Sequence, residues 1–245
     1  PQARHPRRMI VLEGCAQPAA TPRTNAAAAR VLDRLGISLI SSANAGCCGA
    51  ANQHLSDHDG ARQMIRANID AWWPEIEQGA ERIVVTASGC GVQVKDYGRL
   101  MASDPSYSDK AQRISELTAD LGELFSELDL DVLGKPGEGR RIAYHAPCTL
   151  QHGQKLPGLL EGILGRLGFE LVPVADPHLC CGSAGTYSLL QTGISKQLLG
   201  NKLRNLQSNH PELIATANVG CQLHLATGSE VPVVHWIELL DQETA

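Results

Sequence analysis

The sequence predicts an α/β protein of two pseudo-symmetric Rossmann-like lobes, each a mostly parallel sheet with helices on its faces. The first observation behind this prediction is that the eight cysteines of the 245-residue chain form two quartets of matching spacing. The second is that short apolar strands and helical segments alternate in the same order in both halves, which implies βαβ units with right-handed crossovers. The quartets are Cys15, Cys47, Cys48, Cys90 and Cys148, Cys180, Cys181, Cys221.

The spacing of the cysteines indicates a duplicated domain. Three of the four positions repeat at an offset of 133 residues and the fourth repeats at 131. The tripeptide Arg-Leu-Gly at residues 34–36 recurs at residues 166–168, and Asn68 recurs as Asn201. Because such a repeat records duplication of a folded unit, we expect one cysteine-rich domain over residues 1–133, with a C-terminal helix and linker, and a second over residues 134–245.

The first half reads as three strands separated by two helices. We expect strands over residues 9–12, 37–40 and 82–86, and helices over residues 24–35 and 60–76. Each strand is apolar and is followed by a cysteine or by the Cys-Cys-Gly tripeptide. The first half therefore has the composition of two consecutive βαβ units.

The second half repeats this order. We expect strands over residues 142–144, 170–174 and 213–217, and helices over residues 156–167 and 194–208. Between the halves, residues 105–139 show helical periodicity up to residue 128 and then a Gly- and Pro-rich run. This pattern predicts a final helix and a linker.

Strand order explains why cysteines so far apart in sequence belong to one site. Open parallel sheets bind ligands in the crevice at the carboxyl ends of their strands, and in each half the cysteines follow the strands. We therefore expect each quartet to converge at one sheet edge. Glycines beside the cysteines allow backbone amides to approach a negatively charged sulfur atom.

Four converging thiols have four explanations. Disulfides are rare in reducing compartments, and buried free thiols account for single cysteines but not for a repeated quartet. Zinc commonly takes four thiolates, although its sites usually contain a close CxxC pair, which neither half has. Iron–sulfur clusters tolerate wide spacing and need thiolate ligands, so the sequence favours iron–sulfur and leaves zinc as the alternative.

Composition argues against several other classes of protein. The net charge of −5 argues against nucleic-acid binding, since no basic stripe is available for phosphates. No apolar run approaches the about 18 residues of a membrane span, and no signal peptide is visible, so we expect a cytoplasmic protein. No nucleophile elbow or pair of carboxylates indicates a catalytic residue of the chain's own.

The cysteine pattern also carries a family resemblance. Cys-x31-Cys-Cys-Gly-x40-Cys, with x38 in the second copy, resembles the cysteine-rich CCG domain of heterodisulfide reductases and related respiratory iron–sulfur proteins. Longer segments resemble the glycolate oxidase iron–sulfur subunit family. These segments are residues 12–18, 68–74, 86–91, 147–152, 178–187 and 235–238.

This resemblance implies an electron-transfer subunit that is not itself catalytic. It implies iron–sulfur clusters, expected as 4Fe–4S and one per CCG domain, with the eight cysteines as ligands. In that family, flavin-containing partner subunits oxidise glycolate to glyoxylate, and the iron–sulfur subunit carries electrons toward a respiratory acceptor. The complex is expected at the inner face of the membrane through its partners. The alternatives are a zinc-binding or metal-free assembly scaffold for the flavin subunits, or a related lactate-oxidising or heterodisulfide-reductase-like complex.

The chain departs from the family pattern in two ways. The family's N-terminal ferredoxin-like domain is absent, so we expect this chain to represent the C-terminal portion. The family pattern also ends in CxxC, whereas Gln93 and His224 stand where the fifth thiolate would be. His224 is therefore a candidate metal ligand, the other reading being a hydrogen-bond donor near the site. We expect His145, His152 and His178 to be hydrogen-bonding or surface residues rather than ligands.

Overall fold

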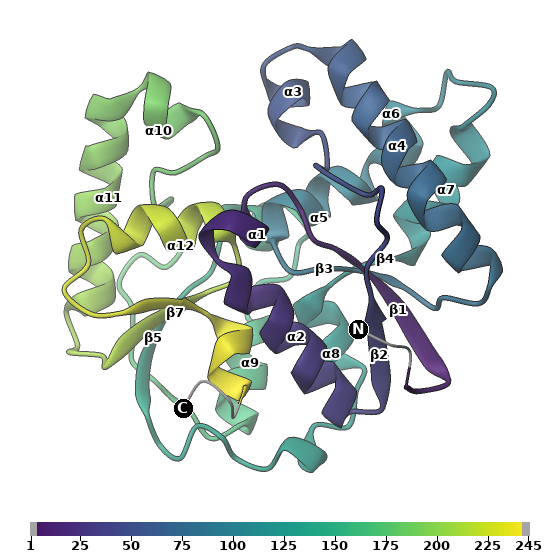
Figure 1. The fold of residues 1–245 in the computed structure, drawn as a ribbon. Helices are drawn as coiled ribbons and strands as arrows, with labels where there is room; N and C mark the ends of the chain where they lie inside the picture. Colours follow the sequence, from purple (N-terminus) through teal and green to yellow (C-terminus); the bar gives the residue numbers. More distant parts are fainter. Residues whose placement is uncertain (1–3, 242–245) are drawn as a thin grey trace. The chain divides into compact units, whose positions relative to one another are not determined.

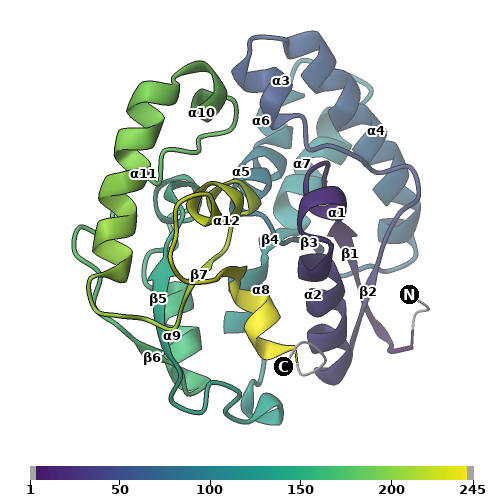
Figure 2. The same ribbon diagram turned by 60° about the vertical axis from the view of Figure 1, so that its left-hand side comes forward.

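Two four-stranded sheets, all parallel, form the framework of the protein, as the computed structural model shows for residues 4–241 (Figure 1). The chain divides into two units, Pro1–Leu124 and Phe125–Ala245, which we call the first and second lobes. Each lobe contains one of the sheets with helices packed around it (Figure 2). The predicted α/β class with two Rossmann-like lobes is thus confirmed.

The sheet of the first lobe has the strand order β2-β1-β3-β4. Its strands are β1 (Arg7–Leu12), β2 (Ile37–Ile40), β3 (Ile83–Val85) and β4 (Thr118–Asp120). The order reverses between β1 and β3, because the chain first moves outward to β2 and then returns across β1. Such a reversal is the topological switch point at which open α/β sheets place their ligands.

Helices connect these strands on both faces. Right-handed crossovers place α2 (Pro22–Arg34), which joins β1 to β2, opposite α4 (His58–Glu77) and α7 (Ser108–Leu117). Helix α4 begins one residue after Asp57, whose side chain accepts a hydrogen bond from the Gly60 amide at 3.0 Å and caps the helix. The shorter helices are α1 (Gln17–Ala20), α3 (Ala50–His54), α5 (Ser88–Lys95), α6 (Tyr97–Leu100) and, at the lobe boundary, α8 (Leu121–Ser126).

The second lobe repeats the topology with the strand order β6-β5-β7-β8. Its strands are β5 (Arg141–His145), β6 (Glu170–Leu171), β7 (Leu213–Thr216) and β8 (Val233–His235). Its α-helices are α9 (Leu159–Arg166), α10 (Tyr187–Leu190), α11 (Thr192–Gln207) and α12 (Val219–Ala226). The lobe also contains two short 3-10 helices, η1 (Asp131–Leu133) and η3 (Trp236–Leu240). A π-helix, η2 (Thr149–Gly153), follows Cys148.

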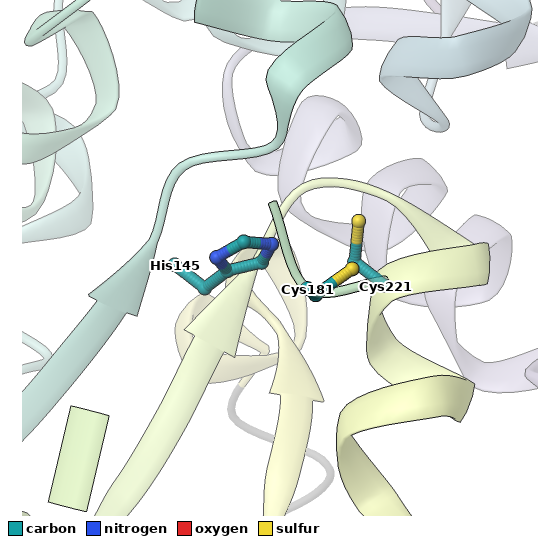
Figure 3. A group of neighbouring side chains, drawn as sticks. All are labelled: His145, Cys181 and Cys221. Atoms are coloured by element: carbon teal, nitrogen blue, oxygen red, sulfur yellow. The ribbon is translucent and has the colours of Figure 1, made fainter. Parts of the chain in front are cut away.

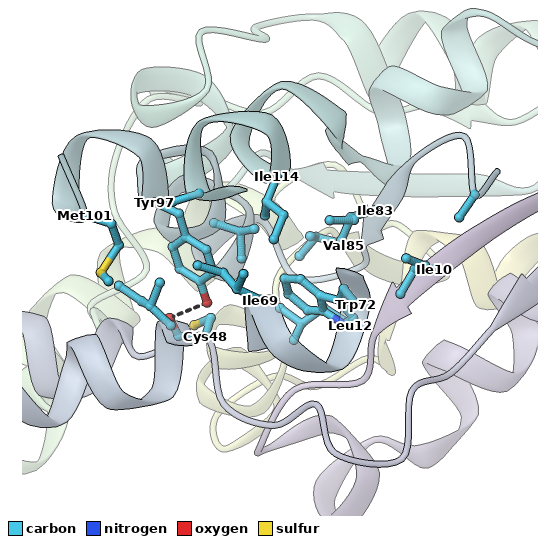
Figure 4. Close-up of a cluster of buried hydrophobic side chains, with 14 of the residues drawn as sticks. Ile10, Leu12, Cys48, Ile69, Trp72, Ile83, Val85, Tyr97, Met101 and Ile114 are labelled. Atoms are coloured by element: carbon cyan, nitrogen blue, oxygen red, sulfur yellow. Dashed lines mark hydrogen bonds between the residues drawn. The ribbon is translucent and has the colours of Figure 1, made fainter. Parts of the chain in front are cut away.

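An apolar core joins the first sheet to the cysteine loop. Figure 4 shows Trp72 and Ile69 of α4 packed with strand residues, and Cys48 at the edge of the same cluster. Trp72 is fully buried and stacks on Tyr97 with ring centroids 6.5 Å apart. Burial of one large apolar side chain contributes about 1.5–3 kcal/mol, so the cysteine loop packs against a stabilising core.

The structure differs from the sequence prediction mainly at two strands. Residues 118–120 were expected to be helical, but they form β4 between α7 and α8 and pair with β3. Strand β8 was not predicted at all and pairs with β7. Both strands have only three residues. An alternation of apolar and polar side chains cannot be recognised in so short a segment of the sequence. In addition, β6 ends at Leu171 instead of residue 174, and Pro173, which lacks an amide donor, follows closely.

Candidate metal centres

The first quartet lies at the carboxyl ends of β1, β2 and β3. Cys15 follows β1, the pair Cys47 and Cys48 precedes α3, and Cys90 lies in the first turn of α5. All eight cysteines of the chain are free thiols. Cys15 is exposed and Cys48 is buried, so this group of thiols reaches from the surface into the core.

The four thiols of the first lobe form one continuous chain of contacts. Cys15 interacts with Cys47, Cys47 with Cys48, and Cys48 with Cys90. Donation to Cys48, together with burial, raises the pKa of Cys47 far above its usual range. Burial followed by contact with Cys47 raises the pKa of Cys15. Thiols gathered in this way resist ionisation until a cation is present, because a bound metal stabilises the thiolate form.

Two buried polar residues fix the backbone of the first Cys-Cys loop. Asn68 Oδ1 accepts from the Gly46 amide at 2.8 Å, and Asn68 Nδ2 donates to the Cys47 carbonyl at 2.9 Å and to Tyr97 Oη at 3.0 Å. Tyr97 Oη in turn donates to the Cys48 carbonyl at 2.9 Å (Figure 4). Because both side chains are fully buried, these bonds hold the vicinal cysteines in one orientation.

The second quartet has the same arrangement. Cys148 follows β5, Cys180 and Cys181 lie in the loop after β6, and Cys221 lies in the first turn of α12. The contacts run from Cys148 to Cys180, from Cys180 to Cys181, and from Cys181 to Cys221. The sequence predicts only that the fourth cysteine of each quartet follows a strand, whereas the structure places it in the first turn of a helix. Sequence reasoning missed these helices because each has only eight residues.

Hydrogen bonds between these thiols shift their pKa values in opposite directions. Donation from Cys148 to Cys180 raises the pKa of Cys148 and lowers that of Cys180. Contact with Cys181 lowers the pKa of Cys221 well below its usual range, and the neighbouring His145 contributes in the same direction. These hydrogen bonds thus link the four thiols of the lobe into one group.

An imidazole joins the thiols in the second lobe. His145 ends strand β5, and its ring faces the sulfur atoms of Cys181 and Cys221 (Figure 3). One ligand atom from each of the three residues lies within 4.8 Å of the others. His145 is fully buried, and neither ring nitrogen has a hydrogen-bond partner among the described residues. A buried polar atom without a partner costs about 1–3 kcal/mol, a cost that coordination to a metal would offset.

A buried lysine adds positive charge next to the second quartet. Lys202 of α11 is fully buried, and its Nζ donates to the Pro177 carbonyl at 2.9 Å. Burial lowers the pKa of Lys202, while the negative charge of the four cysteines opposes this shift. The repeat pairs Asn68 with Asn201, but Asn201 is exposed, so Lys202 takes the buried place that Asn68 has in the first lobe.

The glycine of each Cys-Cys-Gly tripeptide is required by its backbone conformation. Gly49 has φ +85° and Gly182 has φ +91°, and their amides donate to Cys47 Sγ at 3.5 Å and to Cys180 Sγ at 3.3 Å. A Cβ atom at Gly182 would lie 2.5 Å from the Ser195 carbonyl oxygen. The tight turn therefore directs an amide at sulfur and packs the loop against the following helix.

The other histidines lie outside the group of thiols. The Nε2 atom of His224 is 3.2 Å from Ser195 Oγ, and Ser195 Oγ donates to the Gly182 carbonyl at 2.8 Å. His224 therefore contacts the Cys-Cys-Gly loop through Ser195, as a hydrogen-bonding residue near the site would. His152 and His178 are exposed.

The donors that the two lobes present fit a transition metal or an iron–sulfur cluster. Thiolates and imidazole suit iron, zinc and copper, whereas magnesium and calcium require oxygen ligands. Sulfur atoms that accept amide hydrogen bonds, together with the partnerless imidazole of His145, are what such a centre needs. Of the supporting residues, Tyr97, Lys202 and Ser195 gave no signal in the sequence, since their roles depend on burial.

Two α/β lobes with a chain of four thiols at the carboxyl edge of each sheet define a tandem cysteine-rich protein with a candidate metal centre in each lobe. The CCG cysteine-rich domain model matches residues 9–95 and again residues 142–226. The chain therefore belongs to the CCG cysteine-rich domain family. Both matched segments contain a complete quartet.

Curated relatives share nearly the whole chain. It is 54% identical to the glycolate oxidase iron–sulfur subunit of Escherichia coli over 99% of this chain and 59% of that protein. It is 28% identical to the probable glycolate oxidase iron–sulfur subunit of Bacillus subtilis, over 96% of this chain and 54% of that protein. The chain is 30% identical to lactate utilization protein A of Geobacillus thermodenitrificans, over 88% of this chain and 90% of that protein. The chain spans between half and three fifths of the two glycolate oxidase subunits.

Among residues 4–241, no helix is both long enough and apolar enough to cross a bilayer.

Proposed function

We propose that this chain is an iron–sulfur electron-transfer component of an oxidase complex and binds one cluster, of the 4Fe–4S type, in each lobe. The observation that carries the proposal is the repeated chain of four thiols, in the same order, at the carboxyl ends of two parallel sheets. The proposed ligands are Cys15, Cys47, Cys48 and Cys90 in one lobe and Cys148, Cys180, Cys181 and Cys221 in the other.

The chain's own residues would set the properties of each centre. A bound iron–sulfur cluster supplies reversible one-electron transfer. The Gly49 and Gly182 amides hydrogen-bond to cysteine sulfur, which stabilises negative charge there. Burial of Cys48 and Cys181 excludes water from the inner side of each site. Both effects adjust the reduction potential of a cluster, and the exposed Cys15 leaves one side open to a redox partner.

The names of the relatives suggest the partners. We propose that flavin-containing subunits oxidise glycolate, and that this chain receives their electrons and passes them to a respiratory acceptor. A ferredoxin-like domain N-terminal to these residues would be a further partner. We place the complex in the cytoplasm, at the inner face of the membrane through its partners. Similarity to a lactate utilization protein makes lactate the second candidate substrate.

Metal analysis of anaerobically purified protein tests the cofactor. We expect iron and acid-labile sulfide in equal amounts and a broad brown absorption that bleaches with dithionite, because thiolate-bound clusters absorb by charge transfer and accept electrons. Iron, sulfide and zinc per chain, together with the absorption spectrum, are the measurements. A colourless protein with stoichiometric zinc, or with no metal, would replace this proposal with an assembly scaffold for the flavin subunits.

Addition of substrate tests the direction of electron flow. Glycolate alone should leave the absorption of the isolated chain unchanged, because we assign the flavin and the oxidation of glycolate to the partner subunits. Glycolate together with the flavin subunits should bleach it, with lactate as the parallel substrate. Turnover of glycolate with an artificial acceptor by purified, flavin-free chain would contradict this prediction.

A further inference from the structure

The two lobes differ at one position beside their thiols. His145 stands 133 residues after Leu12, the same offset that relates the first three cysteines of each quartet. Both residues end the central strand of their sheet and are paired there, Leu12 with Val85 and His145 with Thr216. At this repeated position the first lobe has the apolar side chain of Leu12, and the second lobe has His145, whose imidazole can bind a metal.

The surroundings of His145 are those of a ligand rather than of a structural histidine. A buried structural histidine normally hydrogen-bonds to oxygen or nitrogen through its ring nitrogens. Among residues 4–241, Nδ1 and Nε2 of His145 meet no such group, and the ring interacts with the Cys221 thiol. The ring instead faces two sulfur atoms (Figure 3). By contrast, the Nε2 atom of His224 is engaged by Ser195 Oγ.

The donor atoms of the three residues lie close enough together to serve one metal centre. Metal–sulfur distances of about 2.3 Å and metal–nitrogen distances of about 2.0–2.1 Å place the ligand atoms of one tetrahedral ion roughly 3.3–3.8 Å apart. One atom each from His145, Cys181 and Cys221 lies within 4.8 Å of the others. The three side chains are therefore near enough to bind the same metal centre, even though 4.8 Å is wider than the ligand spacing around one tetrahedral ion.

We infer that His145 is a ligand of the second-lobe centre, beside Cys181 and Cys221, so that this centre is a mixed imidazole–thiolate site. The first-lobe centre has only thiolates, because Leu12 offers no donor atom. This inference rests on the proposed iron–sulfur function. A neutral imidazole ligand reduces the negative charge of a centre and raises its potential, and the buried cation of Lys202 acts in the same direction. The second centre should therefore be reduced before the first.

Pulsed electron paramagnetic resonance on the reduced full chain tests the ligand directly. Protein grown with 15N-labelled histidine should show a strong nitrogen coupling whose frequency differs from that of unlabelled protein. A redox titration of the same sample should resolve two centres of different potential. This measurement needs no substitution and is independent of how any variant folds.

Matched variants assign the coupling to one residue. His145→Leu copies the residue of the first lobe, and His145→Cys keeps a metal ligand. Both should abolish the nitrogen coupling, and His145→Cys should retain the iron and lower the potential of the second centre. His178→Ala, at an exposed histidine on the loop before Cys180, is the control and should change neither quantity.

The outcomes separate this inference from the function on which it rests. Iron and sulfide in the wild type without a histidine coupling would overturn the ligand assignment and leave the proposed function standing. A coupling that persists in His145→Leu would also overturn it, since another histidine would be the source. Wild-type protein without iron would overturn both proposals.

Discussion

Cys48→Ser is expected to remove about half of the iron from the protein and to leave the second-lobe signal intact, with Cys181→Ser doing the reverse. Each lobe holds a complete and separate chain of thiol contacts, and sites without shared ligands lose metal independently. Iron per chain and the electron paramagnetic resonance spectrum of each variant are the measurements.

The two cysteines are matched controls for each other. Both are buried in their lobes, at 3% and 1% exposure, so that either substitution places a hydroxyl in a comparable environment. The corresponding alanine variants separate loss of a ligand from destabilisation of the fold. Loss of all the iron in either single variant, with circular dichroism unchanged, would mean that one centre uses thiols from both quartets.

Gly182→Ala is expected to destabilise the second lobe strongly and to release its metal. An alanine in the left-handed region costs about 1–2 kcal/mol, and overpacking adds about 1–3 kcal/mol, because the new Cβ atom would lie 2.5 Å from the Ser195 carbonyl oxygen and 3.1 Å from Leu198 Cβ. The free energy of unfolding from urea denaturation and the iron content report the effect.

Two further glycines calibrate this result. Gly49→Ala introduces the same backbone strain, but its new Cβ atom would lie 3.2 Å from the nearest atom, the Ala61 carbonyl oxygen. The loss of unfolding free energy should therefore be smaller than in Gly182→Ala. Gly200→Ala lies inside α11 with only Arg204 Nη1 within 4 Å, at 3.8 Å, and should stabilise the helix by about 0.5–1 kcal/mol. Equal stability and iron content in the Gly182 and Gly49 variants would show that the contact with Ser195 does not matter.

The supporting residues of the two lobes have diverged more than their cysteines. The first loop is held by the neutral pair Asn68 and Tyr97, whereas the second has the cation of Lys202 and the hydroxyl of Ser195. Duplication therefore kept the thiols and the glycine turn and changed the charge around them. Two centres with the same ligand order can then have different reduction potentials.

The sequence by itself determined the lobe architecture. Repeated cysteine offsets and apolar strands such as Ile37–Ile40 are local signals, since strand, helix and turn preferences are written in neighbouring residues. The order of strands also placed the quartets at sheet edges, because parallel strands end together.

Only the tertiary structure decided the fourth strand of each sheet and the surroundings of the thiols. Strands β4 and β8 exist through pairing with β3 and β7, which is a non-local contact. The sequence predicts a hydrogen-bonding or surface residue at His145, and only the tertiary structure shows that it is fully buried beside Cys181 and Cys221. Tyr97 and Lys202 reach the cysteine loops across long sequence separations. Which polar side chains meet inside a core depends on packing between elements, and the pattern within any one element does not specify it.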